Sequence, residues 1–106
     1  MTALPLVGFL ALSGGLLAVG LFGILTRRNF ILLLIAIEIA MNAAILNFVY
    51  FGAFSSRPSV TLMGQSIAVV VIGFAATEVA VGLAIVLALN RVRRSINVAE
   101  ANELRE

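Results

Sequence analysis

Three long apolar stretches follow one another along the chain, at about residues 4–25, 30–51 and 60–89, separated by short polar connections. A helix needs about 20 apolar residues to cross about 30 Å of hydrocarbon. The stretches must be helical, because a lone strand leaves its backbone polar groups unpaired in lipid. The pattern predicts an all-α integral membrane protein, with one domain over residues 1–106, three transmembrane helices and a polar tail at 95–106.

The composition excludes several classes of protein. Of the 106 residues, 62% are apolar and 11% are charged, and the mean hydropathy is +1.18, whereas about a quarter of a soluble domain is charged. The chain has no cysteine, histidine or aspartate. Zinc sites, iron–sulfur ligation and disulfides are therefore excluded, and neither a metal nor a cofactor is expected in this chain. No basic stripe is interleaved with aromatic residues, so membrane lipid is an expected partner and nucleic acid is not.

The seven positive charges are all arginines; six lie at the ends of the spans and predict the orientation of the helices, and Arg105 lies in the polar tail. Arg57 lies alone on one side, and five arginines fall on the other: Arg27, Arg28, Arg91, Arg93 and Arg94. Connections this short make the spans antiparallel neighbours. The positive-inside rule then places the first loop and the C-terminus in the cytoplasm, with the N-terminus outside.

Glu38 and Glu78 are the only carboxylic acids inside the spans, and no arginine lies within the spans to pair with them. A charged carboxylate at the bilayer centre costs about 2.5–3.5 kcal/mol on insertion scales, by analogy with aspartate, and intramembrane acids are functional by default. Glu38 lies ten residues after Arg28 and Glu78 thirteen residues before Arg91, so that both are roughly 15–20 Å from the cytoplasmic ends of their spans. Two carboxyls at one depth on adjacent helices predict a proton relay. The alternative is a protonated glutamate that donates a structural hydrogen bond between helices.

The helical phase of each acid relates it to neighbouring polar and small residues. Asn42 lies one turn beyond Glu38 and is predicted to hydrogen-bond it or to hold a water, while Gly82, one turn beyond Glu78, leaves room for a water or a partner side chain. Nearly opposite the acids run rows of alanine that permit close helix packing, namely Ala36, Ala40 and Ala44 in the second span and Ala76, Ala80, Ala84 and Ala88 in the third. We expect the acids to face partner subunits or an internal water path. The alternative is an ordinary helix contact without a larger assembly.

Two other features have a predicted role in packing. Asn47 points away from Glu38 and is predicted to hydrogen-bond a neighbouring helix. The run Ser13-Gly14-Gly15 in the first span lacks the polar and basic company of a phosphate loop. Its glycines are therefore expected to permit close helix packing.

The sequence resembles a known family over essentially its whole length. The resemblance is carried by Arg27-Arg28-Asn29, Ile35-Ala36-Ile37-Glu38-Ile39-Ala40-Met41-Asn42-Ala43, Gly64-Gln65, Ala75-Ala76-Thr77-Glu78-Val79-Ala80-Val81-Gly82-Leu83-Ala84 and the ending Asn102-Glu103-Leu104-Arg105. These runs, the three-span layout and the two intramembrane glutamates are similar to subunit K of the proton-pumping NADH:quinone oxidoreductases, the respiratory complex I or NDH-1 family.

The resemblance implies roles for individual residues. Glu38 and Glu78 correspond to proton-path acids in a hydrophilic axis that links the quinone-site region to the antiporter-like subunits. Arg27 and Arg28 are implied to shape the cytoplasmic loop. At Thr77 the family usually has alanine, so this chain places a hydroxyl beside the second acid.

The resemblance also implies a role inside a multisubunit enzyme, a translocase in which this chain has no site for electron transfer. NADH, FMN, the iron–sulfur clusters and the quinone belong to partner subunits, and the implied membrane-arm partners are subunits J, A, H and an N-like antiporter subunit. The implied location is the cell inner (cytoplasmic) membrane or a thylakoid membrane. Because donor binding resides in other subunits, NADH, ferredoxin and a deazaflavin are all compatible with this chain.

Two other functions compete with this interpretation. A multisubunit sodium/proton antiporter has a related three-span small subunit, but members of that class lack the acid pair, so Glu38 and Glu78 favour the redox-driven pump. A small multidrug exporter usually has four spans with an acid in the first. The first span here is uncharged, which argues against the exporter.

Overall fold

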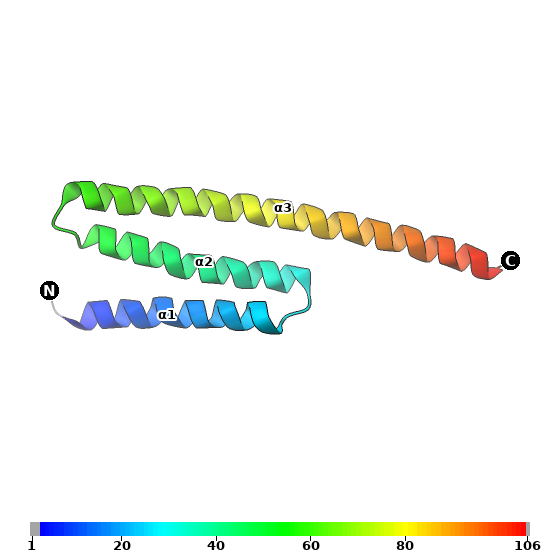
Figure 1. The fold of residues 1–106 in the computed structure, drawn as a ribbon, viewed down its shortest axis with the longest axis horizontal. Coiled ribbons are helices and arrows are strands. Elements are labelled where there is room, and N and C mark those ends of the chain that lie inside the picture. The colour runs from blue at the N-terminus through cyan, green and yellow to red at the C-terminus, as the bar shows by residue number, and fades with distance from the viewer. Residues whose placement is uncertain (1–2, 106) are drawn as a thin grey trace.

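The chain folds into three antiparallel helices. A computed structural model describes the backbone of residues 3–105 and the side chains of residues 5–94. It contains α1 (Ala3–Thr26), α2 (Phe30–Ala53) and α3 (Pro58–Arg105), and no strand within that range (Figure 1). The segments long and apolar enough to cross a membrane are Pro5–Thr26, Phe30–Ala53 and Pro58–Arg94. The predicted all-α fold with three membrane-spanning helices is confirmed.

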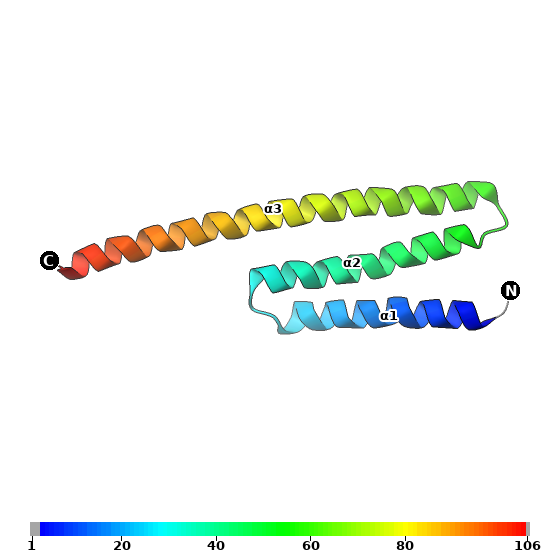
Figure 2. The same ribbon diagram turned by 180° about the vertical axis from the view of Figure 1, so that it is seen from behind.

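The helices lie side by side in a layer with α2 in the middle, as the two opposite views show (Figures 1 and 2). Over residues 3–105, α1 contacts α2 and α2 contacts α3, whereas α1 and α3 do not meet. The Cα trace measures 76 × 25 × 12 Å, so the layer is one helix thick. Both broad faces of α2 and α3 are therefore open to lipid or to other subunits.

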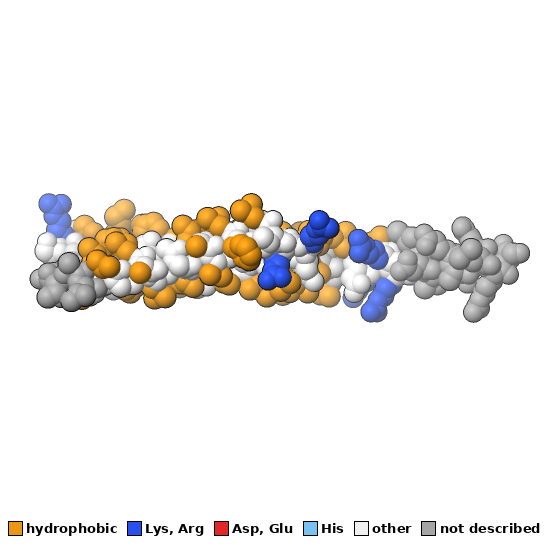
Figure 3. All heavy atoms as spheres, turned by 90° about the horizontal axis from the view of Figure 1, so that it is seen from below, with side chains coloured by type: hydrophobic (Ala, Val, Ile, Leu, Met, Phe, Trp, Pro, Cys, Tyr) orange, Lys and Arg blue, Asp and Glu red, His pale blue; other side chains and the backbone are white. Residues whose placement is uncertain are grey.

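The positive charges lie towards the ends of this layer. All six arginines between residues 5 and 94 are exposed, and on the face seen in Figure 3 the basic side chains gather towards the two ends with apolar side chains between them. Such a distribution suits a protein whose middle lies in hydrocarbon and whose ends lie at the two interfaces.

Short connections with local hydrogen bonds turn the chain back on itself. The Asn29 side chain caps α2 by accepting hydrogen bonds from the N–H groups of Ile31 (2.8 Å) and Leu32 (3.4 Å). This is the usual role of asparagine at a helix start. At the other end α3 begins at Pro58, a favoured first helical residue because its missing N–H would have no intrahelical partner.

The third helix is longer than the predicted span. The apolar pattern ends at residue 89 and predicts a polar tail at 95–106; α3 continues without interruption through most of this tail, to Arg105. The segment after Arg94 contains neither proline nor glycine and is rich in alanine and glutamate, so nothing in it stops a helix. Side chains of residues 95–106 and the backbone of Glu106 lie outside the described part.

Small residues form the contact between α1 and α2. A Cβ added at Gly20 would lie 2.7 Å from the Ala40 nitrogen, and one added at Gly23 would lie 2.6 Å from the Ala36 Cβ. The glycines that permit close packing are thus Gly20 and Gly23. The sequence also predicted close packing at Gly14 and Gly15. That prediction is wrong within this chain, because a Cβ added at either glycine would meet nothing within 4 Å.

We expect Gly23→Ala to weaken the contact between α1 and α2 by about 1 kcal/mol, at the lower end of overpacking costs, because the Ala36 methyl group has no rotamer into which to retreat. The measurement is the temperature at which the assembled membrane complex dissociates, followed on native gels. The matched control is Gly14→Ala, whose added methyl group meets open space. Equal dissociation temperatures for the two variants would contradict the expected result.

Candidate functional site

The contact between α2 and α3 fixes the relative height of the two intramembrane acids. Near one end Gly52 lies against Gly64, and further along Leu34 lies against Gly82. The two contacts are eighteen residues apart on both helices, so the helices run in register. Glu38 is four residues from Leu34 and Glu78 is four residues from Gly82. Each acid therefore lies one turn from the same contact, in the same direction, and both lie at the same height.

Glu38 lies on one side of this contact. Its side chain is half-buried and lines a groove of about 350 Å³ between α2 and α3. We call this the Glu38 groove; its other lining residues are Ile31, Leu34, Ile35, Ile39, Val79 and Leu83. The carboxyl is the only titratable group in an otherwise aliphatic groove, so it needs a polar partner from outside the groove.

Glu78 lies on the opposite side of the same contact. Val79, the next residue along α3, lines the Glu38 groove, and successive residues of a helix point about 100° apart. Glu78 therefore points away from that groove. Ile67 lies eleven residues, or three turns, before Glu78, so that these two side chains point in directions only about 20° apart. Ile67 lines a second groove on the other broad face of the layer. The two acids therefore flank the α2–α3 contact from opposite faces.

Neither carboxyl has a polar partner among the side chains that the structure describes. The side-chain hydrogen bonds found between residues 5 and 94 involve neither Glu38 nor Glu78. Glu78 is exposed and Glu38 only half-buried. In hydrocarbon such groups require partners from other subunits or from water.

The other candidate residues surround the acids less closely than the sequence suggests. Asn42 is exposed and makes no hydrogen bond to Glu38 in the described region. The Thr77 hydroxyl donates to the Phe74 carbonyl oxygen at 2.8 Å, so its proton is engaged within its own helix. Arg27 and Arg28 lie exposed in the connection between α1 and α2.

Gly82 departs from its predicted role. A Cβ at this position would lie 2.6 Å from a terminal methyl group of Leu34. The space beside Gly82 is therefore occupied by an aliphatic side chain of the same chain. It is not left open for a water or a partner side chain.

The two rows of alanine have different surroundings. Ala36 and Ala40 pack against α1, through Gly20 and Gly23. Ala44 and the whole row on α3 are exposed; that row consists of Ala76, Ala80, Ala84 and Ala88. The α3 row is thus a small-residue surface that the described side chains leave uncovered and on which a helix of another polypeptide can pack closely.

Two buried polar groups lie between α1 and α2. Phe9 stacks on Tyr50 with ring centroids 4.3 Å apart; Ser13 and Asn47 lie about one turn further in along their helices. The Asn47 Oδ1 atom is buried without a hydrogen-bond partner. Ser13 is 4% exposed and its hydroxyl donates to the Leu10 carbonyl oxygen at 3.2 Å. The hydrogen bond predicted for Asn47 is absent between these helices, and Ser13 was missed because an isolated serine has no distinctive sequence pattern.

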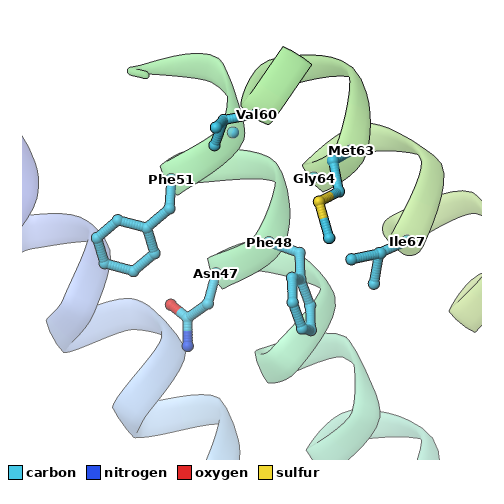
Figure 4. A pocket seen from close by; sticks show the side chains of 8 residues that line it. Asn47, Phe48, Phe51, Val60, Met63, Gly64 and Ile67 are labelled. Carbon is cyan, nitrogen blue, oxygen red and sulfur yellow. The ribbon is translucent and has the colours of Figure 1, made fainter. Parts of the chain in front are cut away.

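The second groove was also missed by sequence reasoning. It has a volume of about 320 Å³ and lies where Gly52 and Gly64 bring α2 and α3 together; we call it the Phe48 groove. Its lining is Asn47, Phe48, Phe51, Gly52, Val60, Met63, Gly64 and Ile67 (Figure 4). A glycine in each of two helices is a detectable signal, but the sequence does not reveal that the two glycines meet.

Comparison with known proteins supplies the family. The family described as NADH-ubiquinone/plastoquinone oxidoreductase chain 4L matches residues 8–106. The chain belongs to this family. The match covers most of α1, the whole of α2 and α3, both acids and both grooves, and it confirms the resemblance found in the sequence.

Individual proteins are similar to this chain over nearly their full length. A protein of Syntrophobacter fumaroxidans named NADH-quinone oxidoreductase subunit K 1 is 46% identical over 94% of this chain and 96% of its own length. Proteins named NADH-quinone oxidoreductase subunit K from Geobacillus kaustophilus and Bacillus anthracis are 43% and 42% identical, over 96% and 99% of this chain and 99% of their own lengths. Together with the three apolar helices, this family membership makes the chain a membrane protein.

Proposed function

We propose that this chain is a membrane-arm subunit of an NADH:quinone oxidoreductase of the complex I type, and that Glu38 and Glu78 relay protons through it. The family supports the first part, since its members are named as subunits of that oxidoreductase. The observation that carries the second part is the position of two carboxyls at one height on opposite sides of the α2–α3 contact.

The geometry suits transfer across the layer of helices. A carboxyl in a low-dielectric site binds a proton reversibly, and the approach of a positive charge favours its release. Because the acids face opposite broad faces, a proton that reaches Glu38 from a neighbour on one face can leave from Glu78 towards a neighbour on the other. The groups that complete the path are water and partner side chains, because the wall around Glu38 is aliphatic.

The surroundings of the chain follow from the same proposal. We infer that Arg27 and Arg28 lie in the cytoplasm, as the positive-inside rule requires, in the inner membrane of a cell or in a thylakoid membrane. The exposed alanine row and the two open faces provide surfaces for membrane-arm subunits J, A, H and an N-like antiporter subunit. NADH, FMN, iron–sulfur clusters and quinone belong to other subunits, and this chain contributes proton transfer only.

The experiment uses membranes from a bacterial host that lacks its own copy of this chain and expresses the present one. We expect the chain to restore both NADH-driven quinone reduction and acidification of the vesicle lumen, with the whole complex visible on a native gel. A sodium/proton exchange activity that is independent of NADH would favour the antiporter subunit instead. An assembled complex without NADH-dependent reduction would contradict NADH as the donor.

A further inference from the structure

The Phe48 groove lies at the end of the described molecule whose only charged residue is Arg57. Its wall on α3 runs from Val60 to Ile67, about 10 Å along the helix axis, and begins one turn after Arg57. The Arg57 backbone is held there: its carbonyl oxygen accepts hydrogen bonds from the N–H groups of Val60 (3.0 Å) and Thr61 (3.2 Å), and its own N–H donates to the Ser55 hydroxyl at 3.2 Å. The Arg57 side chain is exposed.

The groove itself has the chemistry of a hydrocarbon site. Figure 4 shows Phe48 facing Met63 and Ile67 across the groove, with Val60 at the end next to the connection and Asn47 on the side of α1. Gly52 and Gly64 line the groove at the point where the backbones of α2 and α3 meet. Asn47 is its only polar lining residue, and the Oδ1 atom of that side chain is buried.

We propose that the Phe48 groove binds one anionic phospholipid, with its phosphate on Arg57 and an acyl chain along Phe48, Met63 and Ile67. The charge pattern favours a lipid: Arg57 is an exposed cation in the connection one turn before Val60, and the groove lining that follows is uncharged and apolar apart from Asn47. This order matches a phosphate followed by a hydrocarbon chain. Methionine and phenylalanine adapt well to such a chain. This site lies on the face that carries Glu78 and is independent of the proton relay.

Photolabelling of the intact complex tests this proposal. The complex is reconstituted into phosphatidylcholine vesicles that contain phosphatidylglycerol with a photoreactive acyl chain, and the labelled peptides are identified by mass spectrometry. We expect the label to concentrate on residues 48–67. We expect Arg57→Gln to reduce this labelling about fivefold, as for the loss of one arginine–lipid attraction. Val60→Trp is expected to reduce it too, because the indole fills the mouth of the groove.

Matched variants separate the site from general effects. Arg91→Gln removes the same charge from the other end of α3, and Val69→Trp adds the same bulk at a position that is 69% exposed and outside the groove; neither should change the labelling. Label spread evenly over the three helices, or unchanged in Arg57→Gln, would overturn the proposal. A second probe is a photoreactive methionine analogue at Met63. If it crosslinks to a protein subunit and not to lipid, a partner helix fills the groove and the proposal is overturned.

A measurement on the wild-type complex keeps the proposal testable if a variant fails to assemble. Unlabelled phosphatidylglycerol is expected to displace the photoreactive lipid from residues 48–67 better than unlabelled phosphatidylcholine does, because only the former carries a net negative charge at its headgroup. Equal displacement by the two lipids would show that Arg57 selects no headgroup and would contradict the proposed site.

Discussion

Replacement of Glu38 by glutamine is expected to reduce both NADH-driven quinone reduction and proton pumping about a hundredfold, the loss typical of a missing proton-transfer group, in a complex that still assembles. Glutamine preserves the shape of the side chain and its place in the Glu38 groove, but it carries no titratable proton. Electron transfer falls with pumping because a tightly coupled enzyme stalls when its proton path is interrupted. The measurement records NADH oxidation and lumen acidification in the same vesicles, with a native gel to verify assembly.

The control for this prediction is Glu38→Asp, which keeps the carboxyl and should retain part of both activities. Glu78→Gln is expected to have a similar or smaller effect, since Glu78 lies on the exposed side of the contact. An assembled Glu38→Gln complex with wild-type rates would show that the carboxyl is structural or bypassed, and the relay would have to be abandoned. Uncoupled quinone reduction without pumping would contradict the assumption of tight coupling.

The common height of the acids could be predicted from sequence, but the faces they occupy could not. The distances of Glu38 and Glu78 from arginines at the span ends already indicated a similar depth, because the rise per residue of a helix is constant. The side of each acid depends on which surface of α2 meets α3. That surface is set by the meeting of Gly52 with Gly64 and of Leu34 with Gly82, which are contacts between helices that no pattern within one helix specifies.

The length of the third helix beyond its membrane span could not be predicted from hydropathy, for a related reason. Hydropathy marks where a helix leaves hydrocarbon, whereas helix termination requires a stop signal such as glycine or proline. Neither occurs after Arg94, so α3 outlasts its membrane span. Gly14 and Gly15 show the same limit of sequence patterns. A pair of glycines is typical of a close contact between helices, but the contact also requires a neighbouring helix on the same side. Within this chain α2 lies against Gly20 and Gly23 instead.

Gly64→Ala is expected to cost about 1–3 kcal/mol of stability, the range for overpacking a tight contact, and to lower the yield and the activity of the complex together. The added Cβ would lie 2.7 Å from the Phe48 carbonyl oxygen and 3.0 Å from the Gly52 Cα. Both are backbone atoms that cannot rotate away, so α2 and α3 must separate. Separation alters the relative positions of the two acids, and activity is therefore expected to fall by more than the loss of assembled complex explains.

The measurement is NADH oxidation per assembled complex, together with the dissociation temperature on native gels. Gly73→Ala is the matched control on the same helix, because its Cβ would meet nothing within 4 Å. Gly82→Ala should be milder than Gly64→Ala, since its Cβ would meet only Leu34 side-chain atoms, and a leucine can change rotamer where a carbonyl oxygen cannot. If Gly64→Ala matches Gly73→Ala in both measurements, the Gly52–Gly64 contact does not set the register of α2 and α3, and the placement of the acids on opposite faces loses its physical basis.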